Sequence, residues 1–226
     1  MTEDIKLLAF DFATASETVL QVLMEDASDP EIFRDILTAN TGRIEVLKLL
    51  LDSADVPDDI REEARKYLSL PVELGKMPRK DAQATTEQRK QSILKQIQAL
   101  TVGEKVALAM RGGSVVRSIL AKDSNKEVVL CVLKNPKVNA TEAEMIAHSR
   151  NVPEDALRLI AKNREWMKNY AVVTALVNNP KTPVGLASAL VTNLRTKDMA
   201  ILENNKNVSE AVRATARRLI ATRKPK

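Results

Sequence analysis

The chain has 226 residues, of which 44% are hydrophobic and 29% are charged, and its formal net charge is +5. That length suits one extended domain or two small ones, and no run of 18 or more apolar residues predicts a transmembrane helix. The acidic start MTEDIKLLAF is unlike the basic start of a signal peptide, and the single cysteine, Cys131, excludes an internal disulfide, so we expect a cytoplasmic protein.

Helix-forming residues dominate the chain, which has only six glycines and no alternating pattern bounded by hairpin turns. We therefore expect an all-α fold of short antiparallel helix pairs. In the first part, the periodicity predicts helices at 3–10, 14–25, 29–38, 42–52 and 57–68. The polar stretch LPVELGKMPRKDAQATTEQ, residues 70–88, is then predicted to be a linker. Further helices are predicted at 88–99, 102–110, 114–122, 126–134, 141–149, 153–162, 165–178, 182–193, 196–204 and 208–222.

These elements predict an acidic N-terminal helical segment at 1–69, the linker at 70–88 and a basic C-terminal helical domain at 89–226. Residues 1–75 hold 7 Lys/Arg and 17 Asp/Glu, a net charge of −10, which leaves 28 and 13, or +15, for the remainder. This polarity favours either attraction between acidic and basic parts or an anionic partner for the basic part. Chance and solubility are the alternative explanation.

Three segments align without gaps: VPDDIREEARKYL from Val56, VPEDALRLIAKNR from Val152 and VSEAVRATARRLI from Val208. A proline or serine follows each valine, and acidic residues come next, which is typical of a helix start. A second similarity pairs SILAKD at 118–123 with RLIAKN at 158–163. The chain is therefore expected to repeat one helical unit at irregular intervals.

A third similarity is the tripeptide Asn-Pro-Lys, which follows an apolar run at 135–137 and again at 179–181. Asn tolerates the left-handed conformation that closes a helix, and Pro cannot continue one, so the tripeptide predicts a helix end. Thr141 and Thr182 are the expected caps of the helices that follow. A ligand role for Lys137 and Lys181 is the alternative.

These irregular helix pairs resemble HEAT and armadillo repeats and are similar to the leucine-rich-repeat-variant arrays of bacteria. The resemblance is carried by SVVRSILAKDSNKEVVLCVLKNPKV, NVPEDALRLIAKNREWMKNYAVVTALVNNPKTP and NVSEAVRATARRLI; it covers residues 100–222 well and 28–68 more weakly. It implies a stack of helix pairs that presents an extended surface to a partner. The iron–sulfur cluster of some repeat-variant proteins needs several cysteines, so it is not expected here.

Motifs for chemistry are scarce in this sequence. His148 and Cys131, the single histidine and cysteine, cannot form a Cys/His metal site, and neither a P-loop nor a G-x-S-x-G motif occurs. Cys131 is expected in the core and His148 at a helix end, while RGGS at 111–114 predicts a turn between helices. We therefore expect a protein that is not an enzyme, with no catalytic, cofactor-binding or metal-binding residue.

Two segments hold candidate partner-binding residues. In NREWMKNY, residues 163–170, Trp166 and Tyr170 are expected on one helix face, and Arg164 and Lys168 on a different face. The aromatic pair either fills a junction between helices or forms a hot spot for a partner. The C-terminal helix is expected to expose a basic face. The candidates are Arg164, Trp166, Lys168, Arg213, Arg217 and Arg218.

The expected function is that of an adaptor or scaffold whose extended helical surface binds another protein. The alternative is a HEAT-like nucleic-acid-binding protein that contacts the phosphate backbone through the basic C-terminal helices. Few aromatic residues argue against stacking on single strands, and the acidic residues among the basic ones argue against strong duplex binding.

Overall fold

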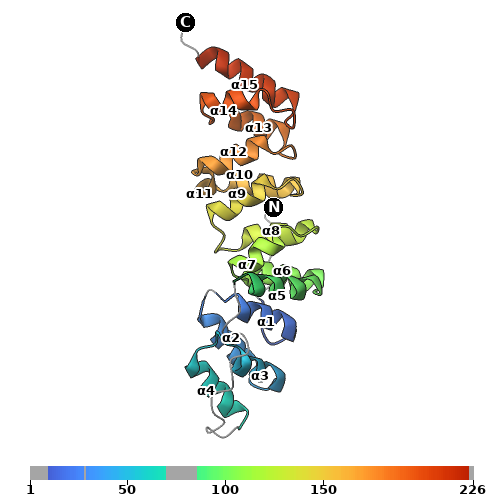
Figure 1. Cartoon of the computed structure of the whole chain (residues 1–226), viewed down its shortest axis with the longest axis vertical. Coiled ribbons are helices and arrows are strands. Elements are labelled where there is room, and N and C mark those ends of the chain that lie inside the picture. The colour runs from blue at the N-terminus through green and yellow to red at the C-terminus, as the bar shows by residue number, and fades with distance from the viewer. Residues whose placement is uncertain (1–9, 28, 70–85, 224–226) are drawn as a thin grey trace, which may run out of the picture. The chain divides into compact units, whose positions relative to one another are not determined.

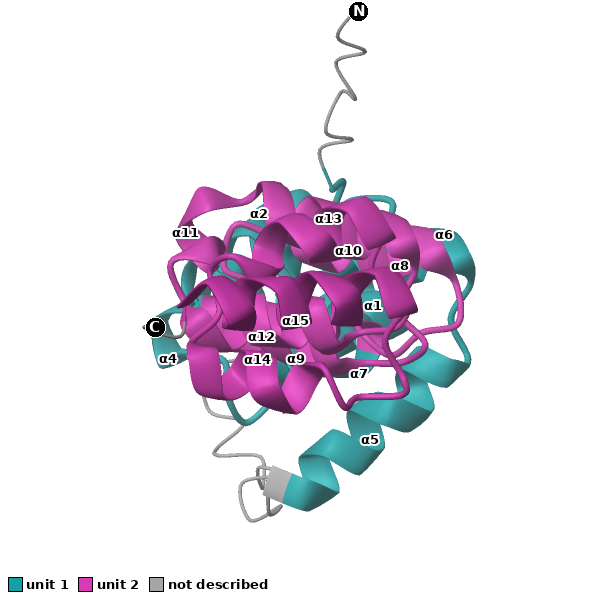
Figure 2. Ribbon diagram, turned by 90° about the horizontal axis from the view of Figure 1, so that it is seen from above, with its two compact units in different colours: residues 1–119 teal, residues 120–226 magenta. Residues whose placement is uncertain are grey.

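The computed structural model describes residues 10–27, 29–69 and 86–223, and every regular element in these ranges is a helix (Figure 1). The all-α prediction is confirmed. The helices form two compact units, residues 1–119 and 120–226, which Figure 2 distinguishes by colour. The predicted helix at 3–10 and most of the predicted linker at 70–88 lie outside the described residues, and helix α5 begins at Thr86. The linker remains a prediction.

The first unit contains six helices and most of a seventh within the described residues. They are α1 (Glu17–Glu25), α2 (Glu31–Ala39), α3 (Ile44–Asp52), α4 (Asp58–Tyr67), α5 (Thr86–Gln98), α6 (Val102–Arg111) and α7 (Ser114–Leu120). One apolar stripe per helix forms the core, in which Leu20, Ile36 and Leu50 are completely buried. Helices this short are marginal alone, so the core between them stabilises each one.

The RGGS motif is the predicted turn, and it joins α6 to α7. The Asp26 carboxylate, at the end of α1, accepts the backbone N–H groups of Val115 (3.3 Å) and Val116 (2.7 Å). It thus satisfies donors at the start of α7 that have no partner within their own helix. A Cβ on Gly113 would lie 2.1 Å from the Asp26 carbonyl oxygen, so this close approach requires glycine.

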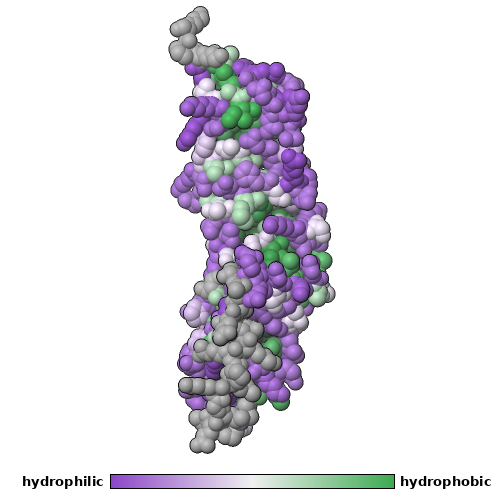
Figure 3. Space-filling model, viewed as in Figure 1, coloured by the Kyte–Doolittle hydropathy of each residue, from purple (hydrophilic) through white to green (hydrophobic). Residues whose placement is uncertain are grey.

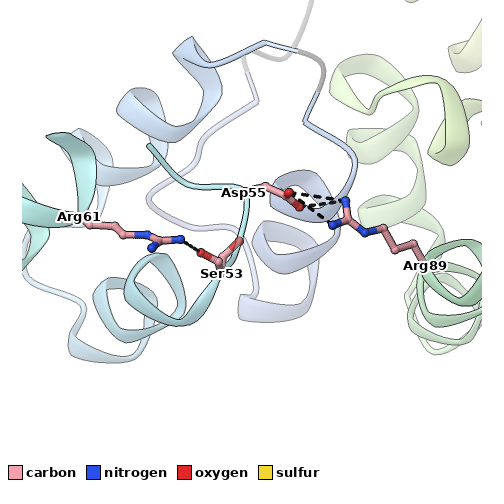
Figure 4. Close-up of polar contacts among 4 residues, drawn as sticks. All are labelled: Ser53, Asp55, Arg61 and Arg89. Carbon is pink, nitrogen blue, oxygen red and sulfur yellow. Dashed lines mark hydrogen bonds and ion pairs between the residues drawn. The ribbon is translucent and has the colours of Figure 1, made fainter. Parts of the chain in front are cut away.

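Two arginines, on α4 and α5, bind to residues of the loop between α3 and α4 (Figure 4). Arg61 is buried and donates to the carbonyl oxygen of Ser53, which ends α3. Arg89, in α5, forms an ion pair with Asp55 at 3.2 Å. Residues on either side of the segment 70–85 are therefore in direct contact within the first unit.

The second unit contains eight helices within the described residues 120–223. They are α8 (Lys126–Lys134), α9 (Ala140–His148), α10 (Glu154–Lys162), α11 (Arg164–Met167), α12 (Tyr170–Asn178), α13 (Val184–Val191), α14 (Thr196–Leu202) and α15 (Glu210–Arg223). No helix in the described chain is both long and apolar enough to cross a bilayer.

Hydrogen bonds between helix ends show which helices of the second unit are parallel. The Asn179 amide, just after α12, donates to the carbonyls of Ala147 and Ser149 at the end of α9 (2.6 and 2.9 Å). Asn205, just after α14, donates to Asn178 at the end of α12 (3.0 Å). The C-terminal ends of α9, α12 and α14 therefore lie together, and we call these parallel helices layer A.

The remaining long helices of the second unit form layer B: α8, α10, α13 and α15. The short connections make α8 and α10 antiparallel to α9, and α13 antiparallel to α12. Arg223, at the end of α15, donates to the carbonyls of Leu194 (2.8 Å) and Thr192 (2.7 Å) just after α13, so these two helices are parallel. This two-layer packing is compatible with a helical repeat.

One six-residue turn recurs between helices, at 53–58, 135–140, 149–154, 179–184 and 205–210. It begins with Ser or Asn, buries Val or Thr at its fourth position and starts a helix at its sixth. In the last four turns the first side chain accepts the backbone N–H of the third residue. The five buried residues are Val56, Val138, Val152, Thr182 and Val208, so four of them are valines. The segments aligned from Val56, Val152 and Val208 therefore start their helices at the same offset.

Some expected helix ends are wrong. The cap of α9 is Asn139, which forms a capping box with Glu142, and the residue before α13 is Pro183. Thr182 is instead buried and donates to the Leu176 carbonyl (2.6 Å). The expected helix at 165–178 is two helices, because the Asn169 side chain accepts the Ala171 N–H (2.9 Å) and starts α12 anew.

Candidate protein-docking face

The two Asn-Pro-Lys turns do not form one site. The first turn precedes α9, whereas Asn179 of the second turn bonds to carbonyls at the far end of α9. Lys137 and Lys181 are both exposed, but they lie at opposite ends of a nine-residue helix, about 13 Å long at 1.5 Å per residue. A ligand small enough to be held between two lysines would not reach both.

Asparagine does not close these helices through the left-handed conformation, so that expectation is wrong. Asn135 (φ −64°, ψ 126°) and Asn179 (φ −80°, ψ 123°) are extended. A following proline pushes the preceding residue out of the helical region, and this effect dominates. The buried asparagine side chains instead satisfy backbone groups: each accepts the N–H of the lysine two residues later at 2.9 Å.

The segment NREWMKNY places its two aromatic residues on separate helices, so the expected shared face is wrong. Trp166 lies on α11 with only 8% of its surface exposed, between the helices that α11 contacts, α9, α10 and α12. Tyr170 begins α12, donates its hydroxyl to Asp198 and lies under the Arg195 guanidinium, 4.6 Å from the ring centre. These contacts support the interpretation that Trp166 fills a junction between helices.

The other predicted partner-binding residues differ in their surroundings. Arg164 and Lys168 are exposed, and Lys168 forms an ion pair with Glu165 at 2.7 Å. On α15, Arg213 pairs with Glu210 at 2.6 Å, and Arg217 pairs with the same carboxylate. Arg218 is exposed. The structure brings Arg164 and Lys168 to one turn, while the α15 arginines lie on another helix and share an acidic neighbour.

On the outward side of layer A, uncharged residues recur at helical spacing, which sequence reasoning missed. They lie on α9, α12 and α14, and each is exposed or half-buried; Lys197, at the start of α14, is a charged residue that borders them. We call this the uncharged face: Thr141, Met145, His148, Ala171, Thr174, Asn178, Ala200, Ile201 and Asn204. Its most exposed apolar side chains are Met145 (50%) and Ile201 (68%). Glu144 is half-buried beside the face and lies 3.8 Å from His148.

Polar side chains on the uncharged face bond to their own helices. Thr174 donates to the Tyr170 carbonyl (3.0 Å), Asn178 to the Thr174 carbonyl (2.9 Å) and Asn204 to the Ala200 carbonyl (3.0 Å). Groups already paired in this way cost less free energy to remove from water than unpaired groups. A partner protein could therefore cover this face with little desolvation penalty.

Three of the four layer B helices are charged by contrast, whereas α13 carries no charged residue. Exposed lysine, arginine, aspartate and glutamate side chains recur on α8, α10 and α15, and several form ion pairs along the helix, such as Arg158 with Glu154 at 2.5 Å. Figure 3 shows one side of the molecule, on which hydrophilic residues surround smaller hydrophobic areas. The scarcity of fixed charge on the uncharged face is therefore not a general property of the surface.

Next to the uncharged face lies a row of exposed basic residues, which we call the basic edge. It comprises three turns, one at the start of each layer A helix: α8 to α9, α10 to α12, and α13 to α14. Its members are Lys134, Lys137, Lys162, Arg164, Lys168, Arg195 and Lys197. Three acidic residues share these turns, and each has a hydrogen-bonding partner: Glu142 on Asn139, Glu165 on Lys168, and Asp198 on Tyr170.

The opposite edge, where the layer A helices end, has a different charge. Its turns carry three exposed basic residues, Arg150, Lys181 and Lys206, together with Glu154, Asp155, Glu203 and Glu210. Its formal charge is thus 3 − 4 = −1, against 7 − 3 = +4 for the basic edge. Of the two edges of layer A, only the one at the helix starts carries a net positive charge.

Reactive groups lie elsewhere. Cys131 is half-buried on α8, and burial raises the pKa of its thiol, which keeps it protonated near neutral pH. In the first unit, hydrogen bonds from Ser16 and Thr101 lower the pKa of Glu104. Within the described residues, no cluster of three or more His, Cys, Asp or Glu side chains is placed to hold a metal ion.

No protein-family model matches this chain, and comparisons with curated proteins and with solved structures give no significant match.

Proposed function

We propose that this chain is a non-catalytic helical-repeat scaffold of the HEAT/armadillo type, and that it binds another protein through the uncharged face. The observation that carries this proposal is the recurrence of uncharged residues at helical spacing on the outward sides of three parallel helices. Cores of protein interfaces are depleted in charged residues and enriched in methionine. The uncharged face has an exposed methionine, Met145.

The packing of the second unit supports the repeat type. Helices of one layer are parallel to each other and antiparallel to those of the other layer, so neighbouring pairs stack side by side. Side-by-side helix pairs are the arrangement by which HEAT-like arrays build extended binding surfaces. The recurring six-residue turn supplies the same connection at irregular sequence intervals.

Contact with nucleic-acid phosphates is the second candidate, and the basic edge alone favours it. The α15 arginines, which suggested this function from the sequence, support it less because Arg213 and Arg217 share Glu210.

A photo-cross-linking amino acid placed at Thr174, the centre of the uncharged face, tests the proposal. We expect it to form an adduct with a protein in lysate of the source cells, and the same reagent at exposed Glu127 on α8, in the charged part of layer B, to form none. Excess unmodified chain should suppress the adduct. A Met145→Asp/Ile201→Asp chain should not, because it places two carboxylates on the docking face.

Equal adducts from both positions, or equal suppression by both competitors, would contradict the proposal. Both substitutions are at exposed positions, so circular dichroism should show unchanged helix content.

A further inference from the structure

The three turns of the basic edge are spaced by helix packing. Each turn leads into one layer A helix, and neighbouring layer A helices are in contact. Asn179, after α12, donates a hydrogen bond to the end of α9, and the Tyr170 hydroxyl of α12 donates one to Asp198 of α14. Packed helices lie about 8–10 Å apart. The first two turns are therefore separated by about that interval; α12 and α14 are linked by hydrogen bonds at their two ends, which places the third turn at that distance or slightly farther along the edge.

An extended polypeptide matches this interval. It rises about 3.3 Å per residue, so about three residues span the distance from one turn to the next. Successive side chains of an extended strand alternate in direction, but lysine and arginine have long, flexible side chains that can follow either direction. A strand crossing the starts of the layer A helices would thus meet basic residues with every third side chain.

We propose that the basic edge binds an extended acidic segment of the partner protein, with acidic residues three positions apart. This rests on the proposed function, in which the partner is a protein. The edge carries a formal charge of +4, and its three acidic side chains are held by Asn139, Lys168 and Tyr170. The opposite edge, at −1, would not attract such a segment.

Phosphates of a nucleic acid are the competing ligand, and the geometry favours the peptide. Of the two aromatic side chains in these turns, Trp166 is buried and Tyr170 is covered by Arg195, so neither offers a stacking surface for a base. The adjoining uncharged face would then receive the rest of a protein partner, whereas it would contribute nothing to a polyanion.

Fluorescence anisotropy with the full chain tests this inference. One labelled peptide has the sequence EGSEGSE, with glutamates three apart, and a second, GSEEEGS, has the same residues with adjacent glutamates. At about 50 mM salt, where screening is weak, we expect the spaced peptide to bind more tightly. The variant Lys134→Gln/Lys162→Gln/Lys197→Gln removes one exposed charge per turn and should weaken binding roughly tenfold, since each exposed ion pair contributes a factor of a few.

The matched control is Arg150→Gln/Lys181→Gln/Lys206→Gln, which removes three exposed charges from the opposite edge. It changes the net charge equally and should leave peptide binding within about twofold of the unsubstituted chain. Equal weakening by both triple variants would show that net charge alone attracts the peptide, and would overturn the inference. Equal affinity for the two peptides would contradict the proposal that the acidic residues are three positions apart.

Duplex DNA is the third probe. The contrary result is a duplex that, at about 150 mM salt, binds more tightly than the spaced peptide and loses this binding in the basic-edge variant alone. That result would show that the basic edge binds a nucleic acid and not an acidic peptide. Absence of peptide binding while the Thr174 adduct persists would overturn this inference and leave the scaffold proposal intact. Loss of both signals would overturn both.

Discussion

At the scale of single residues, asparagine organises the second unit. Asn179 is 5% exposed, and its amide joins two carbonyls at the end of α9 to a turn after α12. Carbonyls at a helix end have no partner within the helix, so a donor from the neighbouring helix stabilises both elements. Asn205 makes the corresponding link from α14 to Asn178.

Replacing Asn179 should therefore destabilise the second unit. Asn179→Ala removes both donors and the acceptor for the Lys181 N–H, and should cost roughly 1–3 kcal/mol, the penalty for leaving buried polar groups unpaired. Urea unfolding followed by circular dichroism measures this loss. Asn179→Asp keeps the acceptor but brings a carboxylate against two carbonyl oxygens, so it should be at least as destabilising.

The control is Asn151→Ala, at an exposed position of the equivalent turn, which should change stability by less than about 0.5 kcal/mol. Similar losses for Asn151→Ala and Asn179→Ala would contradict the argument. The sequence showed that Asn-Pro-Lys ends a helix, but not that its asparagine bonds to a helix about 30 residues earlier, because a distant backbone partner has no local signature.

At the scale of elements, local signals located most helices well. The helix predicted at 126–134 has those bounds, and the helices predicted from 102, 114 and 196 begin at those residues. Caps, prolines and acidic first turns mark such starts. The break at Lys168–Asn169 was missed because neither proline nor glycine marks it. The uncharged face was missed too, because recognising it requires knowing that α9, α12 and α14 are parallel.

The short helix α11 anchors Trp166 between longer helices, which predicts a large effect of truncation. Trp166→Ala should cost roughly 3–5 kcal/mol, the range for emptying a buried aromatic site, whereas Trp166→Phe should cost less. Since Trp166 is the single tryptophan, its emission reports this site directly and should be blue-shifted in the free chain. Emission like that of indole in water, or an unchanged stability of Trp166→Ala, would favour the hot-spot interpretation instead.

At the scale of the whole molecule, the packing of α5 and α6 bears on where the chain can be divided. The sequence predicts a basic domain at 89–226, because charge and composition change near residue 75. In the structure, α5 and α6 pack against α1, with Gln96 bonded to Glu25 (3.0 Å) and Ser16 to Glu104 (2.6 Å). Composition does not reveal this packing, since it depends on contacts between residues about 70–90 positions apart.

Two fragments distinguish a domain boundary at residues 70–88 from one between residues 119 and 120. Fragment 120–226 corresponds to one compact unit with its own core, so it should remain helical and unfold cooperatively in urea. Fragment 89–226 keeps α6 and nearly all of α5 without α1, and so exposes apolar side chains such as Ile93 and Ile97 that are buried in the intact chain. It should bind the dye ANS more strongly and aggregate more readily, because exposed apolar patches promote association. Low ANS binding by both fragments would instead favour the division at residues 70–88.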